Sequence, residues 1–259
     1  MLFGLRTRKS IMQFRLKILF FFDSKVFGET KNFEGYKMTI NDEKFQDYSR
    51  ISEKDISEIF EIIEGRVYLR NSGSSPIRIK FPFVLDEDIA KISAMLMDGS
   101  LNKNFYSIMF CQKKDKSKVK EFGEIIERKL GLKPRFIEFN NDAPGVVFTS
   151  KVLGVFFHKF LLIHKSDEPA RIPKWIWNSP RRVIIEYLRY AFAMEGSISQ
   201  YLKGTEIKFH SVDLPYLEDL KKILIEKFCI SSNIQKYYIK EYGWKYYLTI
   251  SSQDGVIKF

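Results

Sequence analysis

Two acidic residues occupy matching places in two copies of one sequence pattern. The segments 94–100 and 191–197 share Ala-x-x-Met-(Asp/Glu)-Gly-Ser, and their acids, Asp98 and Glu195, stand 97 residues apart. Each acid ends a predicted helix, where unpaired backbone carbonyls disfavour a carboxylate unless a cation compensates it. Carboxylate oxygens with open positions suit Mg²⁺ and a phosphate substrate. Two such acids brought together by paired helices would support metal-assisted phosphodiester hydrolysis.

A glycine follows each acid, Gly99 in the first copy and Gly196 in the second. Glycine readily takes the left-handed conformation that ends many helices, so we expect it to turn the chain away from each helix end. A single junction of this kind is most simply an ordinary helix cap. Two copies in matching context are hard to explain by turn chemistry alone, and they favour a site at a pseudo-twofold axis.

The elements around the two junctions repeat as well. Each unit is predicted to run helix, strand, strand, helix, strand, strand, which gives an α+β fold. A closing helix at 150–164 ends the first copy, whereas residues 251–259 are not expected to form its equivalent. The other predicted helices are 86–97, 116–130, the helix before Glu195, and 216–228. The predicted strands are 106–110, 135–140, 146–149, 206–209, 234–240 and 245–251.

This repeat predicts three parts: an N-terminal α/β extension of unknown function at 1–85, a first repeat at 86–170 and a second repeat at 171–259. A polar, proline-bearing linker at 167–174 joins the repeats, and Trp175 and Trp177 are expected to pack it against the core. Within the extension we expect strands at 14–20, 66–70 and 77–81 and a helix at 52–65, which Ser52 and Asp55 begin with a capping box.

Composition limits the class of protein. The chain has 259 residues, 43 Lys+Arg and 32 Asp+Glu, a net charge of +11, and 45% hydrophobic residues, which excludes wholesale disorder. The apolar run 18–22 is far shorter than the roughly 20 residues that span a bilayer. We expect no membrane association and no secretory signal, hence a cytoplasmic, intracellular protein. Two cysteines, Cys111 and Cys229, provide no disulfide framework and are expected to be buried.

The two motif segments resemble those of the LAGLIDADG homing endonucleases of the single-chain, two-repeat type. The matching segments are 91–99 and 188–196, and the resemblance covers roughly residues 77–259. It implies a pseudo-twofold pair of αββαββα units whose saddle-shaped antiparallel sheets lie along double-stranded DNA. It also implies a monomeric, site-specific DNA endonuclease that uses Mg²⁺, with Mn²⁺ as a possible substitute.

The resemblance carries roles to particular residues. Asp98 and Glu195 would bind the metal, with Gly99 and Gly196 beside them. Gln112 and Lys113 would assist catalysis, the first by positioning water and the second by stabilising charge on the phosphate. Residues expected to contact DNA are Lys103, Lys114, Arg135, Asn140, Lys203, Lys208, His210, Lys236, Lys240, Lys245 and Tyr247. Of these, Lys236, Lys240, Lys245 and Tyr247 are expected to share one face of a strand pair.

Three departures from the family pattern leave a second hypothesis open, and one of them is the expected lack of a closing helix at 251–259. The third motif position, usually small, holds Ser93 in one copy and Tyr190 in the other, so the helices are expected to cross elsewhere. The second half also places Ser211 and Val212 where the first has Gln112 and its lysine. The alternative is therefore a catalytically weak or inactive nucleic-acid-binding protein, either a transcription regulator or an RNA maturase with RNA as its partner.

Other features favour ordinary structural roles. His158 is expected at the edge of the core and His164 as a cation at a helix end. The lysine-rich run 113–120 suits a solvated helix start, with phosphate contact as the alternative. The chain carries no phosphate-binding glycine-rich motif and no Gly-x-Ser-x-Gly elbow, and its cysteines and histidines are too few for a zinc finger.

Overall fold

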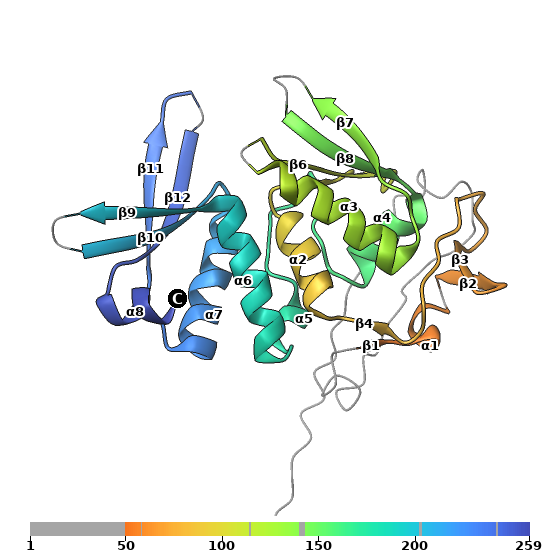
Figure 1. Cartoon of the computed structure of the whole chain (residues 1–259), viewed down its shortest axis with the longest axis horizontal. Coiled ribbons are helices and arrows are strands. Elements are labelled where there is room, and N and C mark those ends of the chain that lie inside the picture. Colours follow the sequence, from red (N-terminus) through yellow and green to blue (C-terminus); the bar gives the residue numbers. More distant parts are fainter. Residues whose placement is uncertain (1–49, 58, 114, 140–142, 202–203, 242) are drawn as a thin grey trace, which may run out of the picture. The chain divides into compact units, whose positions relative to one another are not determined.

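The computed structural model describes residues 50–259 except 58, 114, 140–142, 202–203 and 242. The chain divides into two units, Met1–Tyr48 and Ser49–Phe259, and the elements described below belong to the second (Figure 1). The strand predicted at 14–20 lies outside the described residues. Within the described part, no helix is long and apolar enough to cross a membrane.

The first repeat folds as helix, two strands, helix, two strands, helix. Its elements are α2 (Glu87–Met95), β5 (Ser100–Leu101), β6 (Ser107–Cys111), α3 (Lys116–Leu130), β7 (Arg135–Phe139), β8 (Ala143–Thr149) and α4 (Lys151–Lys159). All neighbouring strands are antiparallel, in the order β5-β6-β8-β7. The helix α3 lies against β6 and β8, where the buried rings of Phe110 and Phe122 stack with centroids 5.1 Å apart.

The second repeat has the same order of elements. They are α6 (Arg181–Glu195), β9 (Gly196–Tyr201), β10 (Gly204–Ser211), α7 (Leu214–Phe228), β11 (Asn233–Ile239), β12 (Gly243–Ile250) and α8 (Gln253–Lys258). The sheet order β9-β10-β12-β11 repeats that of the first sheet. The α+β fold of two αββαββα units with antiparallel sheets is therefore confirmed, and Figure 1 shows α2 and α6 side by side between them.

The strand pairing establishes which residues of the two repeats are equivalent. In each sheet the serine two residues after the motif acid pairs with the next strand, at Met109 in the first repeat and at Lys208 in the second. Counting onward from these two positions, Gln112 is equivalent to Ser211 and the following lysine to Val212. The equivalence predicted from the sequence therefore agrees with the register of the folded chain.

The second repeat does have a closing helix, and the prediction of its absence is wrong. A serine caps both closing helices: the hydroxyl oxygen of Ser150 accepts from a backbone N–H three residues on at 3.2 Å, and that of Ser252 does the same at 3.2 Å. The helix α8 has six residues and includes Gly255. It is too short to produce a periodic apolar pattern, so the capping serine was its main signal in the sequence.

The helix predicted at 52–65 is also wrong beyond its first turn. The capping box of Ser52 forms and begins α1 (Glu53–Ile56), but Phe60–Ile63 is strand β2 and pairs with β3 (Arg66–Leu69). The connecting residues 64 and 65 both have positive φ, 50° and 71°, as a two-residue hairpin turn requires. The first turn residue is glutamate, where asparagine or aspartate is usual, so the turn signal in the sequence was weak. The helical spacing of the apolar residues therefore led to the prediction of a helix.

The remaining elements of the extension are short. The strand predicted at 77–81 is reduced to a single bridge between Val67 and Ile77, whereas β1 (Arg50–Ile51) pairs with β4 (Phe83–Val84).

The linker between the repeats is firmly packed. Trp175, in the short helix α5 (Lys174–Trp177), is buried and donates its indole N–H to the carbonyl of Leu161 at 3.0 Å, so its predicted anchoring role is confirmed. Asp219 of α7 holds the linker through two bonds of 2.7 Å from the Arg171 guanidinium and one of 3.1 Å from the next backbone N–H. The linker therefore fixes the start of α6 against α7.

Replacing this carboxylate should loosen the second repeat. We expect Asp219→Ala to lower the free energy of unfolding by about 2 kcal/mol, because a buried backbone N–H loses its acceptor and a charge-assisted pair is lost. Urea denaturation followed by circular dichroism measures the change. The neighbouring exposed Glu218→Ala is the control and should stay within about 0.5 kcal/mol of the wild type. Equal stability of the two variants would contradict the anchoring role.

Candidate metal and nucleic-acid site

The two motif acids come together at the ends of the central helices. Glu195 is the last residue of α6, and Asp98 follows the turn that ends α2, where its N–H donates to the carbonyl of Met95 at 3.2 Å. Because α2 packs beside α6, the carboxyl groups of Asp98 and Glu195 lie in hydrogen-bonding contact. The packing thus unites two residues that are 97 positions apart in the chain.

The glycines after the acids serve a different purpose from the one predicted. Neither Gly99 nor Gly196 has the left-handed backbone conformation, and Gly196 is extended with φ −91°. A Cβ atom at Gly99 would lie 2.8 Å from the carbonyl oxygen of Met109, and one at Gly196 would lie 2.3 Å from that of Phe192. Glycine is needed here because backbone approaches backbone closely, where each helix passes into its sheet.

Asp98 lies in an environment that disfavours its ionised form. Its side chain reaches solvent, yet the surrounding protein partly desolvates it, and this burial raises its pKa; the hydrogen bond with Glu195 acts in the opposite direction. Gln112, just after β6, donates its amide to Asp98 at 3.3 Å and also lies 3.8 Å from the sulfur of Met194. The first-repeat glutamine thus touches one acid and the helix that carries the other.

The two acids fit a divalent cation that shares its coordination with substrate. Among the residues that the structure describes, no three His, Cys, Asp or Glu side chains gather closely enough to form a metal site by themselves. Mg²⁺ commonly binds one or two carboxylates and completes its octahedron with water and phosphate oxygens. Two carboxyl groups in contact repel when both are ionised, and a divalent cation between them removes that repulsion. Asp98 and Glu195 match this donor set.

The second sheet presents several predicted DNA-contact residues on one face. Lys208, His210, Lys245 and Tyr247 share a face, because residues directly opposite in the register, such as His210 and Tyr247, lie on the same side. Lys236 pairs with Tyr246 and so lies on the other face, beside Trp244 at 5.0 Å. The expectation that Lys236 shares a face with Lys245 is therefore wrong, since the face of a strand residue depends on register.

Partners within this face hold two of these side chains. Lys208 forms an ion pair with Glu206 at 2.9 Å and donates to the hydroxyl of Tyr201 at 3.2 Å. His210 Nε2 lies 3.1 Å from the Ser197 hydroxyl, and burial followed by the nearby lysine lowers its pKa. At neutral pH this histidine is therefore an uncharged hydrogen-bonding group.

The first sheet has a more apolar face. Arg135 is exposed at the start of β7, but its neighbours across the sheet are Val147 and then Met109. Lys103 and Lys240 are exposed in the connections β5–β6 and β11–β12. Three other predicted contact residues, Lys114, Asn140 and Lys203, lie outside the described residues.

The two repeats differ next to the acids. Lys113 is exposed directly after Gln112, whereas the equivalent Val212 is an exposed apolar residue and Ser211 uses its hydroxyl to accept from the N–H of Asp213 at 3.0 Å. At these two positions the second repeat therefore offers neither the amide nor the cation of the first.

Both cysteines are exposed, so the prediction that they are buried is wrong. Cys111 ends β6 close enough to Asp98 that burial and then the aspartate charge raise the thiol pKa. No pattern in the sequence marks Cys111 as a neighbour of the acids, and the strand register reveals it by making Cys111 equivalent to His210.

The two histidines near α4 are structural. His158 lies at the core edge as predicted, with Nδ1 3.0 Å from the carbonyl oxygen of Ile163. His164 is five residues beyond the end of α4, and burial lowers its pKa, so it is not the helix-end cation that was expected.

Comparison with known families supports the motif-based assignment. Residues 182–259 match the family model described as LAGLIDADG-like domain, which confirms the resemblance for this part of the chain. No curated protein matches the sequence significantly.

Three solved structures are similar to the chain at low identity. The chain is 16% identical to I-DmoI in complex with DNA and Mn, with a TM-score of 0.48 over 68% of this chain and 94% of that one. It is 19% identical to I-WcaI bound to its DNA recognition sequence, with a TM-score of 0.46 over 66% of this chain and 78% of that one. It is 14% identical to full-length DUF199/WhiA from Thermatoga maritima, with a TM-score of 0.46 over 67% of this chain and 54% of that one. The fold assignment depends on the strand pairing of this chain, not on these weak similarities.

Removing the Asp98 charge should stabilise the metal-free protein. A carboxyl group whose pKa is raised by folding destabilises the folded state as the pH rises from the ordinary value, here 3.8, through the raised value. We therefore expect Asp98→Asn to be more stable than wild type at pH 7 in EDTA, and the difference to shrink toward pH 4. Urea denaturation across this range tests it, with the exposed Asp167→Asn as control. A variant less stable at pH 7 would contradict the assigned environment.

Proposed function

We propose that this chain is a divalent-metal-dependent endonuclease that cuts double-stranded DNA at a specific site, with Mg²⁺ as the metal and Mn²⁺ able to replace it. The proposal rests mainly on the contact between Asp98 and Glu195, which come from two separate helices and meet where the two repeats join. The LAGLIDADG-like domain at 182–259 gives the second support. A monomer suffices, because one chain supplies both acids.

The residues around the acids suit phosphodiester hydrolysis. A metal bound by Asp98 and Glu195 would supply Lewis-acid stabilisation of the phosphate and a more acidic water. Gln112 orients the Asp98 carboxylate through its amide N–H, and its amide oxygen is an acceptor suited to hold a water molecule. Lys113 presents an exposed ammonium beside that pair, suited to stabilise charge that develops on the phosphate.

The DNA would lie across the two sheets. On the second sheet, Lys208 and Lys245 provide cations for phosphate groups, and Tyr247 and His210 provide hydrogen-bonding groups for base edges. On the first sheet, exposed Arg135 provides a cation on the corresponding face, and Lys103, exposed in the β5–β6 connection, provides another nearby. These contacts would position the scissile phosphates at the two acids.

A binding protein with weak or no catalysis is the second candidate. Its support is the pair Ser211 and Val212, which replaces Gln112 and Lys113 in the second repeat. A chain with one complete half could nick a single strand or only bind. This candidate includes both regulation of transcription and RNA binding by a maturase.

Neutralising either acid should separate cleavage from binding. We expect Asp98→Asn and Glu195→Gln to lose detectable cleavage, because each removes a negatively charged metal ligand. DNA affinity should remain unchanged, since the sheet faces are intact. The assay incubates the protein with Mg²⁺ and a random-sequence duplex library and sequences the ends, and binding is measured separately in Ca²⁺.

Glu186→Gln is the matched control, because this α6 acid pairs with Arg189 of its own helix at 2.7 Å, away from the motif end. It should cut like the wild type. Cleavage by either motif variant would exclude these carboxylates as the metal ligands. Tight, salt-dependent binding by a wild-type protein that never cuts would favour the second candidate.

Because the second repeat lacks counterparts of Gln112 and Lys113, the two DNA strands should be cut at unequal rates. On a site recovered from the library, we expect one strand to be cut more slowly, since one half lacks the amide and the cation. The double substitution Ser211→Gln with Val212→Lys should speed that slower strand by about tenfold. Single-turnover cleavage with each strand end-labelled measures both rates. Equal wild-type rates, or no gain in the double variant, would contradict the assigned asymmetry.

A further inference from the structure

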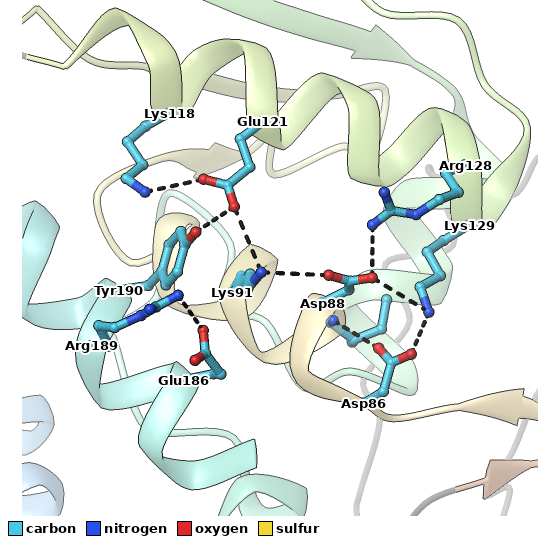
Figure 2. Close-up of polar contacts among 11 residues, drawn as sticks. Asp86, Asp88, Lys91, Lys118, Glu121, Arg128, Lys129, Glu186, Arg189 and Tyr190 are labelled. Atoms are coloured by element: carbon cyan, nitrogen blue, oxygen red, sulfur yellow. Dashed lines mark hydrogen bonds and ion pairs between the residues drawn. The ribbon is translucent and has the colours of Figure 1, made fainter. Parts of the chain in front are cut away.

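Tyr190 occupies the motif position where the resembled family usually has a small residue, and its side chain joins the two repeats. The residue belongs to α6 of the second repeat and is only 3% exposed. Its hydroxyl donates to the carboxylate of Glu121, which belongs to α3 of the first repeat. Figure 2 shows the ring directed toward α3, next to Lys118 and Lys91.

Three cations surround this ring. Lys118 Nζ lies 4.2 Å from the ring centroid, Lys91 Nζ lies 5.5 Å away, and the Arg189 guanidinium lies 5.4 Å away. Partly desolvated cations over an aromatic face are attracted by the negative charge of that face. The same lysines also hold Glu121, at 3.1 Å for Lys118 and 3.7 Å for Lys91. Tyrosine, carboxylate and cations therefore form one connected cluster.

At neutral pH the protonation states of Glu121 and Tyr190 favour the hydrogen bond between them. Burial acts to raise the pKa of Glu121, but the Tyr190 hydroxyl and Lys118 outweigh it and the net pKa is lowered. Burial and then the bond to Glu121 raise the pKa of Tyr190. The carboxylate is thus ionised and the phenol protonated, which is the combination that gives a strong charge-assisted hydrogen bond.

The cluster continues along α2 to its first turn. Lys91 contacts Asp88 at 3.6 Å, and Asp88 accepts from Arg128 at 2.7 Å and lies 3.6 Å from Lys129, both at the end of α3 (Figure 2). Lys129 also pairs with Asp86, the residue that caps α2. These contacts hold α2 against α3 with the two helices running in opposite directions, and Tyr190 attaches α6 to the same pair.

The first repeat has no matching tyrosine. Its equivalent residue, Ser93, is fully buried and donates its hydroxyl to the carbonyl of Ile89 at 2.8 Å within its own helix. On the second repeat, Asp219 is the sixth residue of α7, as Glu121 is of α3, and it holds the linker through Arg171. Among the described residues, this bond from a tyrosine hydroxyl to a carboxylate of the other repeat therefore occurs in one direction only, from α6 to α3.

We propose that Tyr190 is a positioning residue that sets the approach of Glu195 to Asp98 by tying α6 to the first repeat. Tyr190 precedes Glu195 by five residues, which is about 7.5 Å along the helix axis. Rotation or sliding of α6 relative to α2 would move the Glu195 carboxylate by a similar amount at the helix end. The inference deepens the proposed nuclease function, since it concerns the spacing of the two proposed metal ligands.

A distance measurement tests the coupling without relying on cleavage. Nitroxide labels at Cys229, in the second repeat, and at Glu124→Cys on the exposed side of α3, in a Cys111→Ser background, report the separation of the repeats by pulsed electron paramagnetic resonance. We expect Tyr190→Phe and Glu121→Gln each to broaden the distance distribution, and Tyr190→Ser, which matches Ser93, to broaden it most. Glu218→Gln, an exposed acid of α7 outside the cluster, is the control and should leave the distribution unchanged.

Cleavage kinetics provide the second measurement. At saturating DNA we expect Tyr190→Phe and Glu121→Gln to slow single-turnover cleavage roughly 10–100-fold with unchanged DNA affinity and a folded far-ultraviolet spectrum. Unchanged distance distributions in both variants would overturn the inference, as would cleavage at the wild-type rate. If the distributions broaden but the wild-type protein never cuts, the coupling stands and the nuclease function fails.

Discussion

The packing of α2 against α6 imposes one constraint on the site: two acidic side chains, Asp98 and Glu195, lie in contact at the ends of the two helices. Burial disfavours the ionised form of Asp98, and Glu195 lies against it, so the pair needs either a proton or a cation. Hydrophobic packing of α2 on α6 supplies the energy that holds them there, with Ala94 and Ala191 buried on the two helices. Both sheets then extend from glycine junctions that begin immediately after these acids.

The pseudo-symmetry of the backbone is not matched by the side chains. Equivalent positions carry Met109 and Lys208 on the sheet faces, so the first face is largely apolar where the second is cationic and aromatic. The same inequality appears beside the acids, where Gln112 has a serine as its counterpart. Under the proposed function, a symmetric fold with unequal halves would meet an unsymmetrical DNA site, with the second repeat making most of the polar contacts.

The sequence was sufficient for elements with long apolar periodicity and clear caps. The helix 116–130 was predicted to the residue because its apolar residues keep helical spacing, and in the folded chain Asp115 caps its start. Short elements failed: α8 is too brief to show a period, and the hairpin at Glu64 lacks the usual turn residues. The position of Lys236 failed for a different reason, since the side of a sheet that a residue faces depends on a partner strand far along the chain.

The departures from the family pattern differ in what they imply. A large residue at the third motif position seemed to argue against close helix packing, but Tyr190 leaves the crossing to smaller residues and bonds to Glu121 of a third helix. Close approach and lateral attachment are two physical ways to fix a helix pair, and this chain uses both. The absence of an amide and a cation at Ser211 and Val212 has no such compensation at those positions. Under the proposed function, the weaker half of the site would therefore be set by these two residues and not by the tyrosine.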